Sequence, residues 1–76
     1  MARITPIDYL KLIKIFQREG WEYVGTKGDH IQMKKPGHKR RVVIPKYKEI
    51  PVFIIKNNLE VGGITREKYF ELLELI

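Results

Sequence analysis

Three patterns in the sequence predict an α+β fold with the order helix, three antiparallel strands, helix, helix. Apolar residues recur every three or four positions near both ends of the chain, which is the spacing of a helix that buries one face. In the middle of the chain, apolar and polar residues alternate over residues 30 to 35, as in a strand. Glycine and proline residues separate these segments. The length of 76 residues predicts a single domain over residues 1–76.

The first helix is expected over residues 6 to 19. Thr5 has a side chain suited to an N-cap, and Pro6 suits the first helical position. The apolar positions at helical spacing are Tyr9, Leu12, Ile13 and Phe16. Gly20 is expected to end the helix, because glycine readily adopts the left-handed conformation found after many helices.

Three short strands are expected over residues 21 to 25, 30 to 35 and 40 to 44. Gly28 lies in the first turn and can take a positive φ, whereas Pro36-Gly37 marks the second turn. Pro45 is expected to end the third strand. Because both turns are short, the strands should form an antiparallel meander.

Alternation along the middle strand separates a core face from an open face. Ile31 and Met33 point to one face, which the first and second helices can cover. His30, Gln32 and Lys34 point to the opposite face, which is then left open. This open face carries a histidine among lysines, so it is where the sequence predicts chemistry.

Two helices are expected after the sheet. Pro51 opens the first of them, and Gly62-Gly63 ends it. Thr65 then caps the last helix. The apolar stripe of that helix is Tyr69, Leu72, Leu73 and Ile76.

The net charge of +6 is concentrated in residues 27 to 48, here called the basic segment. It contains Lys27, Lys34, Lys35, Lys39, Arg40, Arg41, Lys46 and Lys48. Asp29 is its one acid, so the basic segment carries +7, while the rest of the chain has seven basic and eight acidic residues and carries −1. Segregated positive charge is typical of a nucleic-acid-binding surface, and a solvated, solubilising face is the alternative.

Composition excludes several classes of function. The chain has no cysteine and no serine, which excludes disulfides, thiolate metal sites and a serine nucleophile. The two histidines, with one nearby acid, match no metal-ligand spacing, so neither a metal nor another cofactor is expected. No apolar run reaches membrane-spanning length, and residues 1–6 lack the apolar stretch of a signal peptide. We therefore expect a cytoplasmic protein without membrane contact.

Three side chains are candidates for catalysis or for contact with a nucleic acid. His30 begins a strand on the open face, and an imidazole ordinarily exchanges its proton near neutral pH, as general acid–base catalysis requires. An ordinary half-exposed strand histidine is the alternative. His38 lies at a hairpin tip, which is mobile and poorly suited to catalysis. Tyr47, between Lys46 and Lys48, could stack on a base, or it could lie in the core or against a partner.

Five short motifs occur in a defined order along the chain. They are Gly20-Trp21, Lys27-Gly28-Asp29-His30, Val43-Ile44-Pro45, Ile50-Pro51 and Gly63-Ile64-Thr65. In this order and spacing, the chain resembles the HicA (YcfA-like) family of bacterial and archaeal toxin–antitoxin systems over nearly its whole length. The resemblance implies a double-stranded-RNA-binding-like fold, mRNA endonuclease activity and a partner antitoxin, HicB, that covers the active face.

The same resemblance implies roles for single residues. The family's catalytic histidine corresponds to His30, and its turn glycine corresponds to Gly28. The chain departs from the family pattern at Asp29, where Ser or Thr is usual, and at Ile31, where a second histidine is common. Asp29 could orient the imidazole, or it could repel the phosphate of the substrate.

Charge and resemblance together predict a metal-independent endoribonuclease in which His30 deprotonates a ribose 2′-OH. Lys27, Lys34 and Arg41 are expected to stabilise the charge that develops on the phosphorane. The expected RNA-binding residues are Lys27, Gly28, Lys34, Lys39, Arg40 and Arg41. A non-catalytic RNA-binding module of the same fold is one alternative. A protein-interaction domain whose basic face docks an acidic partner is another.

Overall fold

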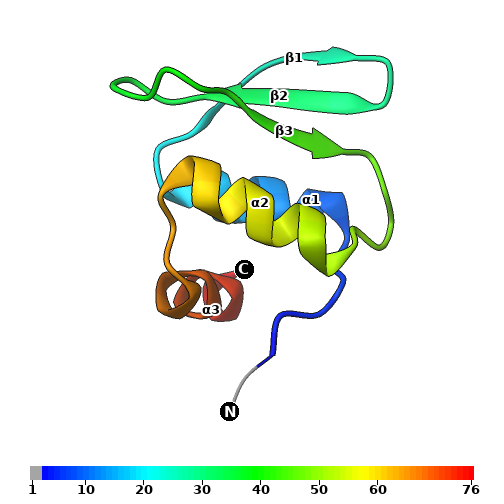
Figure 1. Ribbon diagram of the computed structural model, residues 1–76, viewed down its shortest axis with the longest axis vertical. Coiled ribbons are helices and arrows are strands. Elements are labelled where there is room, and N and C mark those ends of the chain that lie inside the picture. Colours follow the sequence, from blue (N-terminus) through cyan, green and yellow to red (C-terminus); the bar gives the residue numbers. More distant parts are fainter. Residues whose placement is uncertain (1–2) are drawn as a thin grey trace.

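The computed structural model describes residues 3–76 and has the element order that the sequence predicts (Figure 1). The elements are α1 (Tyr9–Arg18), β1 (Glu22–Lys27), β2 (His30–Lys34), β3 (Val42–Pro45), α2 (Val52–Gly62) and α3 (Arg66–Leu75). The strands form one antiparallel sheet in the order β1-β2-β3. The α+β class and the double-stranded-RNA-binding-like order with an extra C-terminal helix are therefore confirmed. Met1 and Ala2, part of the N-terminal segment expected to lack a signal peptide, lie outside the described residues.

Helix α1 begins later than expected. Its N-cap is Asp8, whose Oδ1 accepts a hydrogen bond from the backbone N–H of Leu10 at 2.8 Å. The prediction of Thr5 as the cap is wrong because the preceding segment is extended: Ile7 pairs with Ile50, whose N–H donates to the Ile7 carbonyl at 2.8 Å. The end of the helix is as expected, since Gly20 follows it with a φ of 88°.

The turn between β1 and β2 is shorter than predicted. It consists of Gly28 and Asp29 alone, so β1 continues to Lys27, which pairs directly with His30. Gly28 has a φ of 61°, and glycine at the first position is what type II′ hairpin turns require. The turn therefore sets the register that brings Lys27 opposite His30.

The connection between β2 and β3 is longer than predicted. It runs over residues 35–41, with the expected Pro36-Gly37 turn at its start. The third strand begins at Val42, so Arg40 and Arg41 lie in the loop. Pro45 is the last residue of β3, so it ends the strand as predicted, and it pairs with His30. An edge strand tolerates proline because one of its sides needs no backbone N–H donor.

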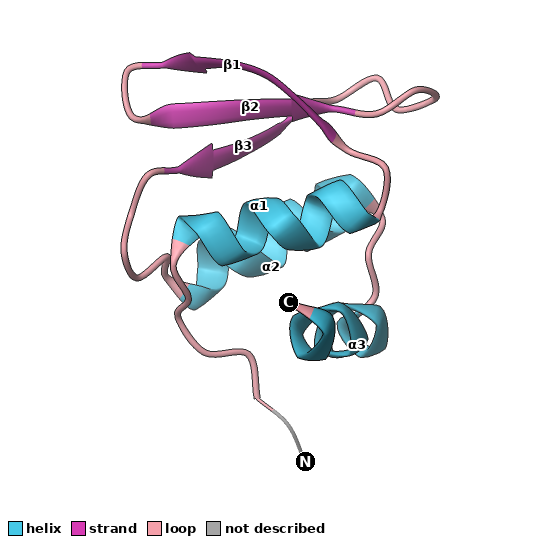
Figure 2. Cartoon of the chain, turned by 180° about the vertical axis from the view of Figure 1, so that it is seen from behind, coloured by secondary structure: helices cyan, strands magenta, loops and turns pink. Residues whose placement is uncertain are grey.

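Helices α1 and α2 cover one face of the sheet. Figures 1 and 2 show them side by side beneath the strands, with α3 on the side of the helices away from the sheet. Ile31 and Met33 of β2 are 4% and 0% exposed on the covered face, as predicted. The core consists of Leu12, Ile15, Phe16, Trp21, Ile31, Met33, Val42, Ile44, Ile50, Ile55, Leu59, Ile64, Tyr69 and Leu72. No helix of residues 3–76 lies over the opposite face of the sheet.

Helix α2 ends against α1 at a glycine. A Cβ at Gly62 would lie 2.7 Å from Cε1 of the buried Phe16, so the two helices approach too closely there for a larger residue. Gly63 then takes the left-handed conformation, with a φ of 67°, and terminates the helix as the sequence predicts.

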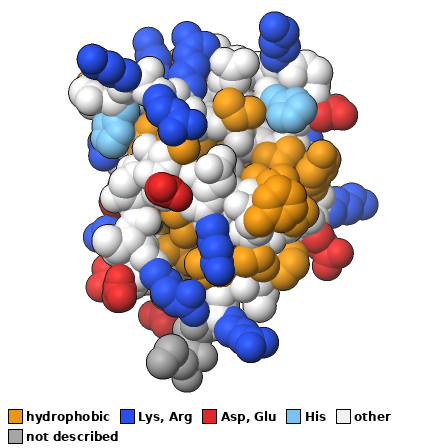
Figure 3. Space-filling model, viewed as in Figure 1, with side chains coloured by type: hydrophobic (Ala, Val, Ile, Leu, Met, Phe, Trp, Pro, Cys, Tyr) orange, Lys and Arg blue, Asp and Glu red, His pale blue; other side chains and the backbone are white. Residues whose placement is uncertain are grey.

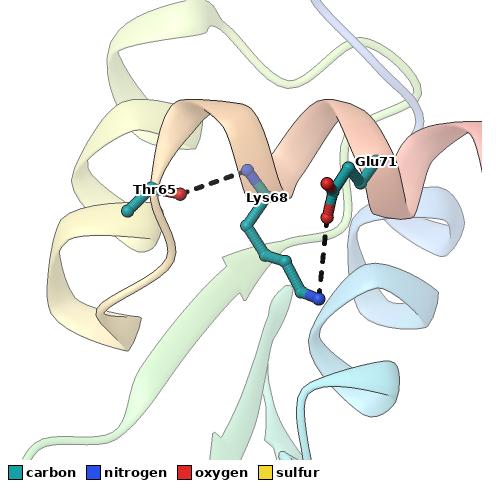
Figure 4. Close-up of polar contacts among 3 residues, drawn as sticks. All are labelled: Thr65, Lys68 and Glu71. Carbon is teal, nitrogen blue, oxygen red and sulfur yellow. Dashed lines mark hydrogen bonds and ion pairs between the residues drawn. The ribbon is translucent and has the colours of Figure 1, made fainter.

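Helix α3 starts at the predicted cap. The Oγ1 atom of Thr65 accepts a hydrogen bond from the backbone N–H of Lys68 at 3.1 Å, and Lys68 forms an ion pair with Glu71 at 3.7 Å (Figure 4). Tyr69 is buried, as expected for the apolar stripe, but Ile76 is 40% exposed and does not belong to it. No helix within residues 3–76 is long and apolar enough to cross a membrane.

Candidate functional site

His30 lies at one end of the open face, between two neighbours on adjacent strands. It is the first residue of the central strand and pairs with Lys27 of β1 and with Pro45 of β3. Its side chain is exposed on the face opposite to the buried Ile31. Because successive residues of a strand point to opposite faces, the burial of Ile31 fixes the outward direction of His30.

The His30 imidazole has no polar partner among residues 3–76, in hydrogen bonds or in ion pairs. The carboxylate of Asp29 forms no hydrogen bond or ion pair with it among residues 3–76, so orientation of the imidazole, one of the two roles considered for Asp29, is not found. Instead, the backbone carbonyl of Asp29 accepts a hydrogen bond from the N–H of Lys46 at 2.8 Å. Both ring nitrogens of His30 are therefore available to an external group.

Lys27 and Gly28 share the His30 end of the face. Side chains directly opposite each other in an antiparallel pair have Cβ atoms about 5 Å apart, which places the Lys27 side chain beside that of His30. Apart from the two adjoining residues, no heavy atom of residues 3–76 lies within 4 Å of a Cβ built on Gly28, so the backbone of this turn is open to a ligand. The structure thus brings together a candidate general base, a cation and an unobstructed backbone.

Lys34 and Arg41 lie farther along the same face. Lys34 is four residues from His30 on β2, or roughly 13 Å along the strand. Arg41 is held over the middle of the face, because its Nη1 donates a hydrogen bond to Oε1 of Gln32 at 2.8 Å. Gln32 is a residue whose role was not foreseen: it positions this arginine.

Lys39 and Arg40 lie in the loop at residues 35–41, beyond the end of β2 that is opposite to His30. Both are exposed. The six expected RNA-binding residues therefore form a line across the open face and its adjoining loop instead of one cluster. Figure 3 shows lysine and arginine side chains gathered over the sheet end of the molecule. Within residues 3–76, no cation of the basic segment forms an ion pair.

His38 has a neighbour that its position at a hairpin tip did not suggest. Its ring packs against the buried Trp21, with ring centroids 5.0 Å apart and an angle of 58° between the ring planes. Its backbone N–H donates to the Lys35 carbonyl at 3.1 Å. His38 is thus ordered against the core, at the far end of β2 from His30.

Sequence reasoning missed the closeness of Lys46 to the candidate base. The Lys46 N–H donates a hydrogen bond to the carbonyl of Asp29, in the turn that precedes His30. Lys46 also follows Pro45, the direct cross-strand partner of His30. The Val-Ile-Pro motif indicates that the strand ends just before Lys46. Only the register of β3 against β2, however, shows that this end lies beside His30. Within the described residues 3–76, no three His, Asp or Glu side chains are grouped so that they could hold a metal ion.

The fold and the site define a class of protein: a small α+β domain whose open sheet face is basic and carries an exposed histidine at one end. The model of the HicA toxin family of bacterial toxin–antitoxin systems matches residues 10–64, which include all of α1 except its first residue, the whole sheet and α2. The chain belongs to this family and is therefore a toxin of the toxin–antitoxin type, which confirms the resemblance. No match was found among curated proteins.

Proposed function

We propose that this toxin is an endoribonuclease that cleaves mRNA by metal-independent acid–base catalysis at His30. The observation that carries the proposal is the exposed imidazole of His30, which has no polar partner among residues 3–76 and belongs to a residue directly opposite Lys27 in the sheet. A general base must reach the proton that it removes, and a cation must lie where negative charge develops. The His30 end of the open face offers one group of each kind, which supports the proposal.

In the proposed reaction, an imidazole nitrogen of His30 removes the proton of a ribose 2′-OH. The 2′-oxygen then attacks the adjacent phosphorus, and the bond from phosphorus to the 5′-oxygen breaks. The proton returns from the imidazolium to the leaving 5′-oxygen, so that the products are a 2′,3′-cyclic phosphate and a 5′-hydroxyl end. Lys27 stabilises the negative charge of the phosphorane. Only RNA supplies the 2′-OH.

The remaining cations bind phosphates on one side of the cleaved bond. Arg41 and Lys34 follow His30 along the open face, and Lys39 and Arg40 continue the line into the loop. Gly28 leaves the turn backbone accessible beside the scissile phosphate. Because such contacts go to the sugar–phosphate backbone, they position the RNA without selecting its sequence.

A HicB-like antitoxin would neutralise the toxin by covering this face. Among the described residues, no helix lies over the open face, and the basic segment, with a net charge of +7, forms no ion pairs. An antitoxin that presents acidic side chains to it would complement this charge and exclude RNA at the same time.

The mechanism predicts that purified protein cleaves RNA at an undiminished rate in excess EDTA. The products should carry a 2′,3′-cyclic phosphate, and a substrate with a single 2′-deoxyribose at the cleavage position should remain intact, because the nucleophile is missing. Gel analysis of end-labelled RNA measures both. Loss of cleavage in EDTA with recovery in Mg²⁺ or Mn²⁺ would instead establish a metal-dependent reaction.

The loop cations should contribute to affinity through phosphate contacts. When a protein binds single-stranded RNA, each phosphate contact makes the slope of log K against log salt concentration more negative by about 0.7. Changing Lys39 and Arg40 together to glutamine should therefore flatten the slope by about 1 to 1.5, and equally for all RNA sequences. Titrations at several salt concentrations measure this. The matched control is Lys11→Gln with Lys14→Gln on α1, which should leave the slope unchanged; equal slopes in both double variants would exclude this loop from the RNA-binding surface.

A further inference from the structure

Tyr47 is an exposed aromatic residue on a firmly held backbone. Its ring belongs to the segment between β3 and α2, and the residue is 46% exposed. Its N–H donates to the Pro45 carbonyl at 2.8 Å, and its carbonyl accepts from the N–H of Tyr9 at 3.1 Å. An aromatic ring that stays in solvent while both backbone polar groups are satisfied presents a fixed apolar surface to a ligand.

This surface lies close to the proposed cleavage site. Pro45 is the direct cross-strand partner of His30, and the backbone N–H of Lys46 donates a hydrogen bond to the carbonyl of Asp29 at 2.8 Å. From these connections, the Cα atom of Tyr47 is within roughly 12 Å of that of His30. Figure 3 shows a hydrophobic patch next to a histidine at the end of the molecule where the segment leading into α2 lies.

The charges around the ring favour a nucleotide over an apolar partner. Lys46 and Lys48 flank Tyr47, and both are exposed without ion pairs among residues 3–76. Glu49 is the one acid in the same segment. An exposed ring between two cations is the arrangement in which single-stranded nucleic acids stack a base and place the adjoining phosphates on lysines.

We infer that Tyr47 stacks on the base of a nucleotide next to the scissile phosphate, so that the substrate is unpaired RNA at that position. The inference rests on the proposed function, which makes RNA the substrate. It adds which part of that substrate the Tyr47 ring recognises. A base inside a duplex has both faces covered by its neighbours, and only an unpaired base can offer a face to a tyrosine.

The test measures binding separately from cleavage, in protein that carries His30→Ala. Fluorescence anisotropy with short oligoadenylate and oligouridylate gives the affinities. Tyr47→Ala should weaken binding of oligoadenylate by roughly 5- to 150-fold, whereas Tyr47→Phe, which keeps the ring, should leave affinity within about two-fold. The preference for adenylate over uridylate, which reflects stacking strength, should disappear in Tyr47→Ala. The salt slope should not change, because the substitution removes no charge.

Tyr23→Ala is the matched control. Tyr23 is 54% exposed, but it pairs with Met33 and so projects from the other face of the sheet, where its hydroxyl bonds to Thr26 at 2.7 Å. Equal affinities for Tyr47→Ala and Tyr23→Ala would overturn the inference while leaving the nuclease proposal intact. Absence of RNA binding in every variant, including the parent, would instead overturn the proposed function and the inference with it.

A second measurement covers the case in which Tyr47→Ala fails to fold. In this measurement, the His30→Ala protein with Tyr47 intact binds a series of oligoadenylates, each of which has one abasic residue at a different position. The affinity for each oligonucleotide is compared. The inference expects one or two adjacent positions at which the abasic residue lowers affinity about as much as the loss of one stacked base. A uniform response along the oligonucleotide would overturn it.

Discussion

Replacing His30 with alanine is expected to lower the rate of RNA cleavage by about 10²- to 10⁴-fold, because general acid–base catalysis contributes a factor of this size. The substitution should change stability by no more than about 0.5 kcal/mol, since the side chain is exposed and has no polar partner within residues 3–76. Initial rates on end-labelled RNA measure the first effect, and thermal unfolding followed by circular dichroism measures the second.

His38→Ala is the control for the other histidine of the chain. His38 packs on Trp21 at the far end of β2, so its loss should leave cleavage nearly unchanged. It should reduce stability by about 0.5 to 1.5 kcal/mol, which is the contribution of one aromatic pair. The opposite pattern, with cleavage lost in His38→Ala and kept in His30→Ala, would place the catalytic centre at the other end of the sheet.

Replacing Lys27 with glutamine is expected to lower the cleavage rate by about 10²- to 10³-fold at saturating RNA. This is the loss that follows the removal of one donor that stabilises developing negative charge. Lys27 is the cation directly paired with His30, so it is the one best placed to contact the phosphorane. Single-turnover rates at saturating and limiting RNA separate this catalytic effect from weaker binding.

Lys34→Gln is the matched variant for Lys27→Gln, since both remove one lysine from the same face of the sheet. Lys34 lies roughly 13 Å from His30 along β2, too far to reach the same phosphorus. It should weaken RNA binding and leave the rate at saturating RNA unchanged. If the two variants behave alike in both measurements, Lys27 acts as a phosphate anchor and the charge of the phosphorane is stabilised by another group.

The parts of the fold that were predictable from the sequence are those set by local chemistry. Thr65 caps α3 and Gly63 ends α2 because hydroxyl capping and left-handed glycine act within a few residues. The start of α1 was not predictable in this way. A backbone pair between Ile7 and Ile50 keeps the chain extended past Thr5, and that contact joins residues far apart in the sequence.

The candidate site likewise has one part that local sequence predicts and another that depends on contacts between distant segments. The outward direction of His30 follows from strand alternation, and its proximity to Lys27 follows from the two-residue turn at Gly28. The places of Lys46 and of the ring of Tyr47 depend on how β3 and the following segment pack on the rest of the domain. The anchoring of Arg41 by Gln32 likewise requires the register of two strands and a side chain that crosses between them.

The segment from Lys46 to Ile50 also bears on how such a toxin can be controlled. Four backbone hydrogen bonds tie it to Asp29, Pro45, Tyr9 and Ile7, and the side chain of Ile50 is fully buried. To distort the proposed catalytic end by an allosteric route, an inhibitor would have to break these bonds and expose part of the core, at a large cost in free energy. Steric occlusion of a rigid surface requires no such rearrangement. For the proposed site we therefore expect inhibition by a partner that covers the face, with activity returning when the partner dissociates.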